Sequence, residues 1–294
     1  MAAKFAKLGV VILKDTSREV LTNPNLSMSI PPVTQLVKGI QIVSDVHLEF
    51  RKKSGAPVII PHAKNLALLG DIGKPFESSY RDFIETQAGQ FEKVFVVMGN
   101  HEYYNSSNLT TDTILTKARE VCSEWNNVHL LERDQFPLDE HVTVLGCTLW
   151  SPLNLKTSHY LNDMNKIYVK QVNKKGKTKK KLLDVDTYFG WHVRDVSWLQ
   201  KTLTEVADSG KKAVVLTHHG PLLDMSGKYK GNAYNSGFVS DLRHLFTPPA
   251  IAFASGHVHS NVDVTVNKVR SVSNALGYPG ETTGYKEDVV LSLE

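Results

Sequence analysis

Short apolar runs alternate with amphipathic helical patterns along most of this chain, and no other feature constrains its fold as strongly. The runs are rich in Val, Ile and Leu, and their apolar cores have the length of buried strands, about 4–8 residues. They are GIQIVSD, NLALLGD, KVFVVMGN, HVTVLGCTLW, KAVVLTHH and AIAFASGH. A chain that alternates strands with helices in this way predicts a layered α/β fold.

Four other segments place apolar residues three and four positions apart, which is typical of helices that bury one face. They are FESSYRDFIETQAGQ, LTTDTILTKAREVCSEW, WHVRDVSWLQKTLTEVA and SGFVSDLRHLF. Asn235 and Ser236 stand at the start of the last segment, and we interpret them as its N-cap. The alternative interpretation is a helix start that attracts phosphate.

The carboxyl-terminal part lacks helical patterns and reads as consecutive strands, from NVDVTVNKVRSVSNALG to EDVVLSLE. Together with NVHLLERDQFPLDEHVTVLGCTLW, these segments predict a second, more antiparallel sheet. The chain is 294 residues long, 41% apolar and 22% charged, which is enough for a sizeable core and is unlike a disordered chain. We therefore expect one large domain over residues 1–294.

The amino-acid composition also indicates the cellular compartment in which the protein resides. Cys122 and Cys147 are too few for a disulfide framework or a zinc–thiolate site, so we expect a reducing compartment. No segment approaches the roughly 20 apolar residues of a membrane span. The amino-terminal MAAKFAKLGVVILK places lysines before an apolar run that is shorter than the roughly 7–15 residues of a secretory signal. These features predict a cytoplasmic protein without a membrane partner.

The formal net charge is only +4, and eight lysines fall between Lys166 and Lys181. There KKGK separates two segments of alternating residues, which predicts a protruding hairpin inserted around residues 166–183. We interpret it as a solvated surface hairpin. The alternative is a binding site for a polyanion.

Polar residues that can bind metals stand at the carboxyl ends of five predicted strands. In chain order they are Asp45, His47, Asp71, Asn100, His101, His218, His219, His257 and His259. Each motif alone is explained by an ordinary turn. Ligands of open α/β sheets bind at the carboxyl ends of strands, so five such ends in one chain predict a single convergent site.

The donors are too many for one ion, because a metal site typically takes about four to six ligands. Two ions are therefore expected, and Asp71, alone on its strand end, is the natural bridge. Nitrogen and oxygen donors without thiolate suit Mn²⁺, Zn²⁺ or Fe. Two ions about 3.5–4 Å apart activate a bridging water for phosphoester hydrolysis, and a nearby unbound histidine would protonate the leaving oxygen.

The ordered motifs DVH, GD, GNHE, THHGP and GHVH resemble those of the calcineurin-like metallophosphoesterases. The resemblance implies a four-layer α-β-β-α sandwich with a dimetal site at one end of the sheets. It implies a first metal on Asp45, His47 and His259, a second on Asn100, His218 and His257, and Asp71 bridging them. It also implies His101 as the catalytic acid and substrate contacts from Asn100, His101 and His219. His218 directly follows VVLT and is preferred over His219 as the ligand.

One position departs from this pattern. Many members of the family read Gly-Asp-x-x-Asp, whereas this chain reads GDIGK and places Lys74 where the second aspartate would orient the catalytic histidine. Glu102 or another acid must then orient His101, or His101 is a weaker acid. The departure disfavours a protein phosphatase and favours small phosphomonoesters or phosphodiesters.

Further stretches, GCTLWSPL, LNDMNKI and SNALGYPGE, are similar to a stand-alone, single-domain branch of these esterases. The similarity implies loops near the site that carry Trp150, Asn162, Asp163 and Tyr278, although Trp150 and Tyr278 fit packing roles equally well. Two alternatives to a small-molecule hydrolase remain. One is a nuclease that uses the lysine hairpin, and nucleic acid is the less favoured partner. The other is a non-catalytic scaffold, which ranks last because every expected ligand is present.

Overall fold

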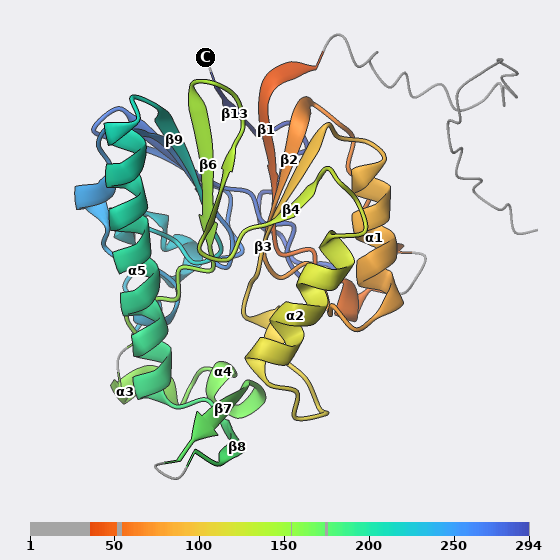
Figure 1. Ribbon diagram of the computed structural model, residues 1–294, viewed down its shortest axis with the longest axis vertical. Helices are drawn as coiled ribbons and strands as arrows, with labels where there is room; N and C mark the ends of the chain where they lie inside the picture. Colours follow the sequence, from red (N-terminus) through yellow and green to blue (C-terminus); the bar gives the residue numbers. More distant parts are fainter. Residues whose placement is uncertain (1–35, 52–54, 154, 174–175, 294) are drawn as a thin grey trace, which may run out of the picture.

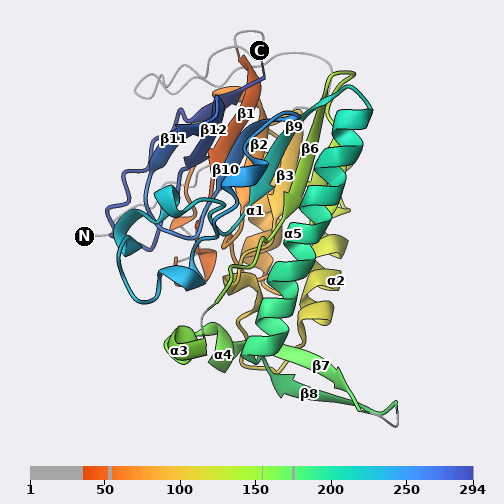
Figure 2. The ribbon, with the colours of Figure 1, turned by 90° about the vertical axis from the view of Figure 1, so that its left-hand side faces the viewer.

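Two β-sheets pack face to face, and helices cover their outer faces (Figures 1 and 2). The computed structural model describes residues 36–51, 55–153, 155–173 and 176–293. The lysine-bearing amino-terminal segment and Lys174 and Lys175 of the predicted hairpin lie outside the described residues. Sheets in the middle with helices outside are the four-layer α-β-β-α arrangement that the family resemblance implies.

The first sheet has the strand order β13-β1-β2-β3-β4. Its strands are β1 (Val37–Val43), β2 (Ala63–Leu69), β3 (Lys93–Val97), β4 (Val128–Leu130) and β13 (Val290–Ser292). Neighbouring strands from β1 to β4 run parallel, and β13 pairs with β1 in the antiparallel direction.

The second sheet has the order β11-β12-β10-β9-β6-β5. Its strands are β5 (Asp134–Pro137), β6 (Val142–Cys147), β9 (Lys212–Thr217), β10 (Ala250–Ser255), β11 (Val262–Val266) and β12 (Val269–Ser273). Only its edge pairs, β5 with β6 and β11 with β12, are antiparallel. The expected second, more antiparallel sheet is confirmed in part, because β5, β6, β11 and β12 come from the expected segments and form its antiparallel edge pairs. The expectation is wrong in that the centre of this sheet is parallel and β4 and β13 belong to the first sheet. The sheet to which a strand belongs depends on pairing partners that are far away in the sequence, and local sequence patterns do not reveal these partners.

Along the central strands, successive side chains alternate between the two faces of the sheet, and this alternation builds the layers. In β2, Ala67 and Leu69 face the second sheet, while Leu66 and Leu68 face the helices on the other side. Val214 and Leu216 of β9 meet the first sheet in the same way. Because successive strand side chains point to opposite faces, fully apolar strands can be buried on both sides.

Three long helices cover the sheets, and the sequence pattern predicted each of them. They are α1 (Ser78–Ala88) and α2 (Thr111–Cys122) on the first sheet, and α5 (Val185–Asp208) on the second. Asp184 caps the amino end of α5 by accepting the backbone N–H of Thr187 at 2.8 Å. Two one-turn helices, α3 (Leu155–Ser158) and α4 (Asp163–Lys166), precede the hairpin.

The helix predicted over residues 236–246 is wrong. The chain forms two short 3-10 turns there, Asn235–Gly237 and Arg243–Leu245, so Asn235 and Ser236 do not cap a helix. Between the turns, Gly220 donates to the Phe238 carbonyl and accepts the Ser240 N–H. These tertiary bonds take up backbone groups that a helix would need. Other 3-10 turns are Leu48–Phe50, His101–Tyr103, Leu223–Met225 and Gly227–Tyr229.

The lysine-rich segment forms a hairpin of β7 (Tyr168–Val172) and β8 (Thr178–Leu182), which projects from the body beside α4 (Figure 2). Most of its side chains are exposed, as expected for a solvated hairpin. Of the described helices, none combines the length and the apolar character that a membrane crossing requires.

Candidate metal centre

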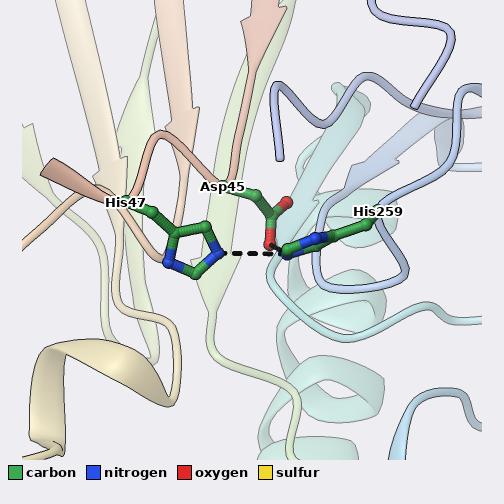
Figure 3. Close-up of side chains that lie close together, drawn as sticks. All are labelled: Asp45, His47 and His259. Atoms are coloured by element: carbon green, nitrogen blue, oxygen red, sulfur yellow. Dashed lines mark hydrogen bonds and ion pairs between the residues drawn. The ribbon is translucent and has the colours of Figure 1, made fainter. Parts of the chain in front are cut away.

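The carboxyl ends of β1, β2, β3, β9 and β10 meet at one end of the two sheets, and the polar residues after them converge. All seven residues expected to bind metals are buried there. They are Asp45, His47, Asp71, Asn100, His218, His257 and His259. Figure 3 shows Asp45, His47 and His259, from opposite ends of the sequence, pointing toward one another. Parallel strands bring these ends together because all of them leave the sheets on the same side.

The backbone of this region is strained. Five of the seven residues have positive φ: 54° for Asp45, 50° for His47, 54° for Asp71, 67° for His257 and 47° for His259. Residues other than glycine rarely adopt this conformation, and strain of this kind concentrates at functional sites. The chain turns abruptly after β1, β2 and β10, which aims these side chains inward instead of along the sheet.

Glycines before two of these residues allow close approach. A Cβ atom at Gly99 would overlap the Asp71 carboxylate, and one at Gly256 would lie 2.7 Å from Asp45 Oδ2. Each glycine therefore lets a neighbouring strand end come within contact distance of a carboxylate.

One cluster of donors consists of Asp45, His47 and His259. His47 Nε2 lies 3.0 Å from His259 Nε2, which lies 3.3 Å from Asp45 Oδ1. Both imidazoles direct their other nitrogen to a carboxylate: His47 Nδ1 lies 3.3 Å from Glu49 and His259 Nδ1 lies 2.6 Å from Glu281. In the neutral tautomers that metal ligation requires, each Nδ1–H has an acceptor and the two Nε2 lone pairs face one another.

Two lone pairs at this distance repel each other unless a cation lies between them. Metal–nitrogen bonds are about 2.0–2.1 Å long, so one ion reaches two nitrogens 3.0 Å apart. Carboxylates behind ligating histidines are the usual way to fix the metal-binding tautomer. The donors present in this cluster therefore fit a divalent metal.

The second cluster consists of Asp71, Asn100, His218 and His257. His218 donates from Nδ1 to the Leu69 carbonyl at 2.8 Å, and its Nε2 lies 3.1 Å from Asn100 Oδ1 and 3.4 Å from Asp71 Oδ1. His257 Nε2 lies 3.3 Å from the Gly237 carbonyl, so this tautomer leaves Nδ1 as a lone-pair donor. Asp71, His218 and His257 each offer an atom within 4.8 Å of the others.

Asp71 belongs to both clusters. Its Oδ1 faces His218, and its Oδ2 lies 3.8 Å from His47 Nε2. One carboxylate thus presents a different oxygen to each cluster, which is the geometry that a bridging ligand requires.

The Asn100 amide is oriented by its neighbours. Its Nδ2 donates to Asp163 Oδ1 and to the Tyr104 hydroxyl, each at 2.9 Å. Because an amide that donates on one side offers its oxygen on the other, Oδ1 points to His218 and the second cluster.

The protonation of these groups matches metal ligands. Burial lowers the pKa of His218 to about 4 and the pKa of His257 well below 6.5, so both rings are neutral at pH 7. Burial raises the pKa of Asp71 well above its ordinary value, and the charges of Glu102 and Asp45 add to this effect. A carboxyl that is costly to ionise among other carboxylates needs a cation beside it.

The pKa of Asp45 is shifted in the opposite direction from that of Asp71. Burial opposes its ionisation, but His259 and the other nearby imidazoles outweigh burial and hold its pKa well below the usual range. Burial likewise lowers the pKa of His259, yet the Asp45 and Glu281 charges overcome this and raise it.

His219 follows His218 after β9, but its ring does not belong to either donor cluster. It is fully buried against the Trp150 and His257 rings, with Nδ1 3.3 Å from the Thr148 carbonyl and Nε2 3.4 Å from the Tyr188 hydroxyl. Trp150 is a packing residue in the same apolar surroundings. Of the adjacent pair, His218 lies in a group of possible metal ligands with Asp71 and His257, and His219 belongs to none of the groups found among the described residues. Neither histidine lines the cleft that opens onto the clusters.

His101 stands beside both clusters. Its backbone N–H donates to Asp71 Oδ1 at 2.8 Å, and its ring Nδ1 lies 3.0 Å from Glu49 Oε1. Burial lowers the pKa of His101 to about 4, and the Glu49 carboxylate opposes this shift. Its Nε2 lies 3.4 Å from the Tyr278 hydroxyl.

Glu102, which the sequence offered as the acid behind His101, has a different role. Its carboxylate accepts the backbone N–H groups of Asp71 at 3.0 Å, Ile72 at 2.6 Å and Gly99 at 2.7 Å. Glu102 thus ties the loop after β2 to the loop after β3 and so sets the position of Asp71.

A cleft of about 180 Å³ opens onto the two clusters. It is lined by Asp71, Asn100, His101, Tyr104, Tyr160, Leu161, Asn162, Asp163, Tyr229, Phe238, His257, His259 and Tyr278. Asn162, Asp163 and Tyr278 therefore lie at the site, as the similarity to the single-domain branch implies. Of the described residues that line the cleft, none is Lys or Arg.

Sequence reasoning missed two carboxylates, Glu49 and Glu281. Glu49 stands two positions after His47, so its place in the motif was a usable signal. Glu281 stands in a loop 22 residues after His259, and no local pattern connects the two.

Comparison with known proteins agrees with the geometry. A sequence model described as calcineurin-like phosphoesterase matches residues 40–261. An uncharacterised protein, L509 of Acanthamoeba polyphaga mimivirus, is 28% identical over 277 residues, which cover 87% of this chain and 96% of that protein.

Two solved structures match most of the chain, and the first is similar in fold. The phosphopantetheinyl hydrolase of Mycobacterium tuberculosis has a TM-score of 0.59 at 16% identity, over 83% of this chain and 91% of its own. A dimetal phosphatase from Danio rerio has a TM-score of 0.49 at 13% identity, over 85% and 90%.

Proposed function

Since the chain belongs to the calcineurin-like phosphoesterase family, we propose that it is a dimetal-dependent hydrolase of small phosphomonoesters or phosphodiesters. The observation that carries this proposal is Asp71, which presents one oxygen to each of two buried donor clusters. A single ion would leave one of these clusters, and one side of the bridge, without a cation.

Each cluster has a complete set of donors. Asp45, His47 and His259 would hold one ion, Asn100, His218 and His257 the other, and Asp71 both. All these donors are nitrogen or oxygen, and the two cysteines are buried outside the clusters, which favours Mn²⁺, Zn²⁺ or Fe. When bound, such a pair of ions lowers the pKa of a water molecule and neutralises charge on the phosphoryl oxygens.

The proton for the leaving group would come from His101. As a water oxygen bonds to phosphorus and the ester P–O bond breaks, the electron pair of the broken bond stays on the leaving oxygen. This oxygen would take its proton from Nε2 of a doubly protonated His101 ring, whose Nδ1–H stays on Glu49. His101 lines the cleft, and its ring edge at Nδ1 is held by Glu49, so Nε2 is the free nitrogen. Proton transfer by a positioned side chain contributes about 10²–10⁴-fold to the rate.

The cleft supports a substrate with one small phosphoryl group. Its described lining contains no Lys or Arg to pair with further phosphates, and several of the residues around it are aromatic. The metal ions would be the cations that neutralise a phosphoryl group there, and additional anionic groups would find no partner in the lining.

The test compares wild type with Asp71→Asn on nitrophenyl phosphate and bis-nitrophenyl phosphate, with Mn²⁺, Zn²⁺ or Fe²⁺ added. We expect metal-dependent turnover of at least one ester, and we expect Asp71→Asn to abolish it because the bridge loses its charge. Lack of turnover of both esters with every metal would favour the non-catalytic scaffold.

The nuclease alternative keeps one specific observation in its favour. The lysine hairpin follows directly after α4, and Asp163 of α4 lines the cleft. Lys166, the last residue of α4, lies over the Tyr104 ring, 5.4 Å from its centroid. A nuclease would bind single- or double-stranded nucleic acid with an affinity that falls steeply as salt is added.

A further inference from the structure

Glu49 holds the His101 ring at its Nδ1 edge, which leaves Nε2 available for proton transfer. Glu49 Oε1 lies 3.0 Å from Nδ1, and a carboxylate at this distance accepts the N–H of that nitrogen. The other nitrogen, Nε2, faces Tyr278, a residue that lines the same cleft. The direction of Nε2 therefore depends on where Glu49 holds the ring.

The Glu49 carboxylate is itself restrained. Only 9% of its side chain is exposed, and Oε1 also lies 3.3 Å from His47 Nδ1 and 3.9 Å from Lys74 Nζ. Lys74 donates a hydrogen bond to the backbone carbonyl of His101 as well. Two imidazoles and one ammonium thus gather around a single oxygen, which limits the rotamers that Glu49 can adopt.

The geometry points to Glu49 as the positioning residue for His101, with Lys74 holding the carboxylate in place. Glu102 cannot take this role, because backbone N–H groups already occupy its oxygens. The same Glu49 oxygen binds the Nδ1 edge of His47, so one carboxylate aligns the proton donor with a histidine of the first cluster.

This inference rests on the proposed hydrolase function, because it needs His101 to protonate a leaving oxygen. A positioned acid matters most where that oxygen is strongly basic, since such a group leaves poorly as a free anion. Glu49 is therefore expected to matter more for phenyl phosphate than for p-nitrophenyl phosphate, whose leaving group is far more acidic.

The kinetic test uses the full-length protein saturated with Mn²⁺ and compares wild type, Glu49→Ala, His101→Ala and the double variant on both esters. We expect Glu49→Ala to lower kcat about 10²-fold on phenyl phosphate and clearly less on p-nitrophenyl phosphate. In the His101→Ala background, Glu49→Ala should cause no further loss, because residues that act as a unit are not additive. Equal losses on both esters, or full additivity, would overturn the inference.

Metal content is measured for each variant, since Glu49 also touches His47. If Glu49→Ala only weakened metal binding, kcat at saturating metal would stay at the wild-type value, and the inference would be wrong. Glu49→Gln keeps an oxygen that accepts the Nδ1–H, so it should retain more activity than Glu49→Ala. Glu92→Ala is the matched control, because Glu92 pairs with Lys64 on the surface and should have no effect.

A spectroscopic test needs neither metal nor substrate. The ¹⁵N chemical shifts of His101 in the metal-free protein should report the Nδ1–H tautomer in wild type and its loss in Glu49→Ala. An unchanged tautomer would exclude Glu49 as the positioning group. If the wild type hydrolyses neither ester, the proposed function is contradicted. If the wild type and Glu49→Ala are both fully active, only this inference is contradicted.

Discussion

Glu281 supports the metal-binding groups without belonging to either cluster. It accepts the Nδ1–H of His259 at 2.6 Å and the backbone N–H of Tyr278 at 3.0 Å, and it forms an ion pair with Lys228. These partners outweigh burial and lower the pKa of Glu281 to about 2, so it is ionised at pH 7. An ionised carboxylate behind His259 makes the imidazole a stronger ligand.

We therefore expect Glu281→Gln to weaken metal affinity by about 10–100-fold, because a neutral amide orients His259 less firmly. Excess metal should restore most of the turnover, since no donor atom of the clusters is lost. Titration with Mn²⁺, followed by activity, measures this shift. Glu287→Gln, at an exposed position of the same segment, is the control. An unchanged metal affinity would show that Glu281 has no such role.

His219 gives the fold a dependence on pH. Burial lowers its pKa well below 6.5, so the folded protein keeps it neutral while the unfolded chain protonates it below pH 6.5. The unfolded state then binds more protons, and the stability that His219 contributes is lost as pH falls from about 6.5 toward the folded-state pKa. The limiting slope is about 1.4 kcal/mol per pH unit.

His219→Gln should remove this part of the pH dependence. We expect the difference in unfolding free energy between metal-free wild type and variant to shrink as pH is lowered from 7 to 5. Urea unfolding at several pH values measures it. A difference that is constant over this range would contradict the assignment of a buried, neutral His219.

At the scale of elements, the hairpin of β7 and β8 forms a two-stranded sheet of its own, outside the two sheets that build the site. Lys170 and Lys180 stand directly opposite each other in it, and like charges in this position repel. Lys177, Lys179 and Lys180 are exposed, so they add charge to a surface element instead of packing against the sheets.

We expect Lys177→Gln, Lys179→Gln and Lys180→Gln, combined in one variant, to leave kcat/KM on bis-nitrophenyl phosphate unchanged, because none of them lines the cleft. Binding of single-stranded DNA, measured at several salt concentrations, checks the nuclease alternative. Strong, salt-sensitive binding by wild type that the triple variant loses would favour that alternative over a small substrate.

At the scale of the whole molecule, the candidate metal ligands come from both sheets. Asp45, His47 and Asp71 come from the first sheet, while His218 and His259 come from the second. Ions held between these residues would crosslink the two sheets, and a ligand that binds the folded state alone stabilises that state.

Addition of Mn²⁺ at about 100 times its Kd should stabilise the protein by about 2.7 kcal/mol for each site. Thermal unfolding with Mn²⁺ and with EDTA measures this as a difference in Tm, and Asp71→Asn should remove most of it. Equal Tm values under both conditions would mean that the clusters do not bind this metal.

The sequence by itself determined the central strands, the three long helices and the motif residues at the strand ends. It did so because apolar periodicity and turn residues act over a few positions along the chain. It failed at residues 236–246, where the backbone bonds between Gly220 and its partners replaced a helix, and at β4 and β13, whose sheet depends on distant pairing.

Only the tertiary structure shows that His218 lies beside Asp71 and His257, that Glu281 lies against His259 and that Glu49 lies behind His101. Each of these contacts depends on the direction in which a side chain leaves the backbone and on which loop then lies against it. Such contacts join residues up to hundreds of positions apart, as with His47 and His259. A sequence pattern identifies the donor residues, but only packing determines which groups each donor contacts.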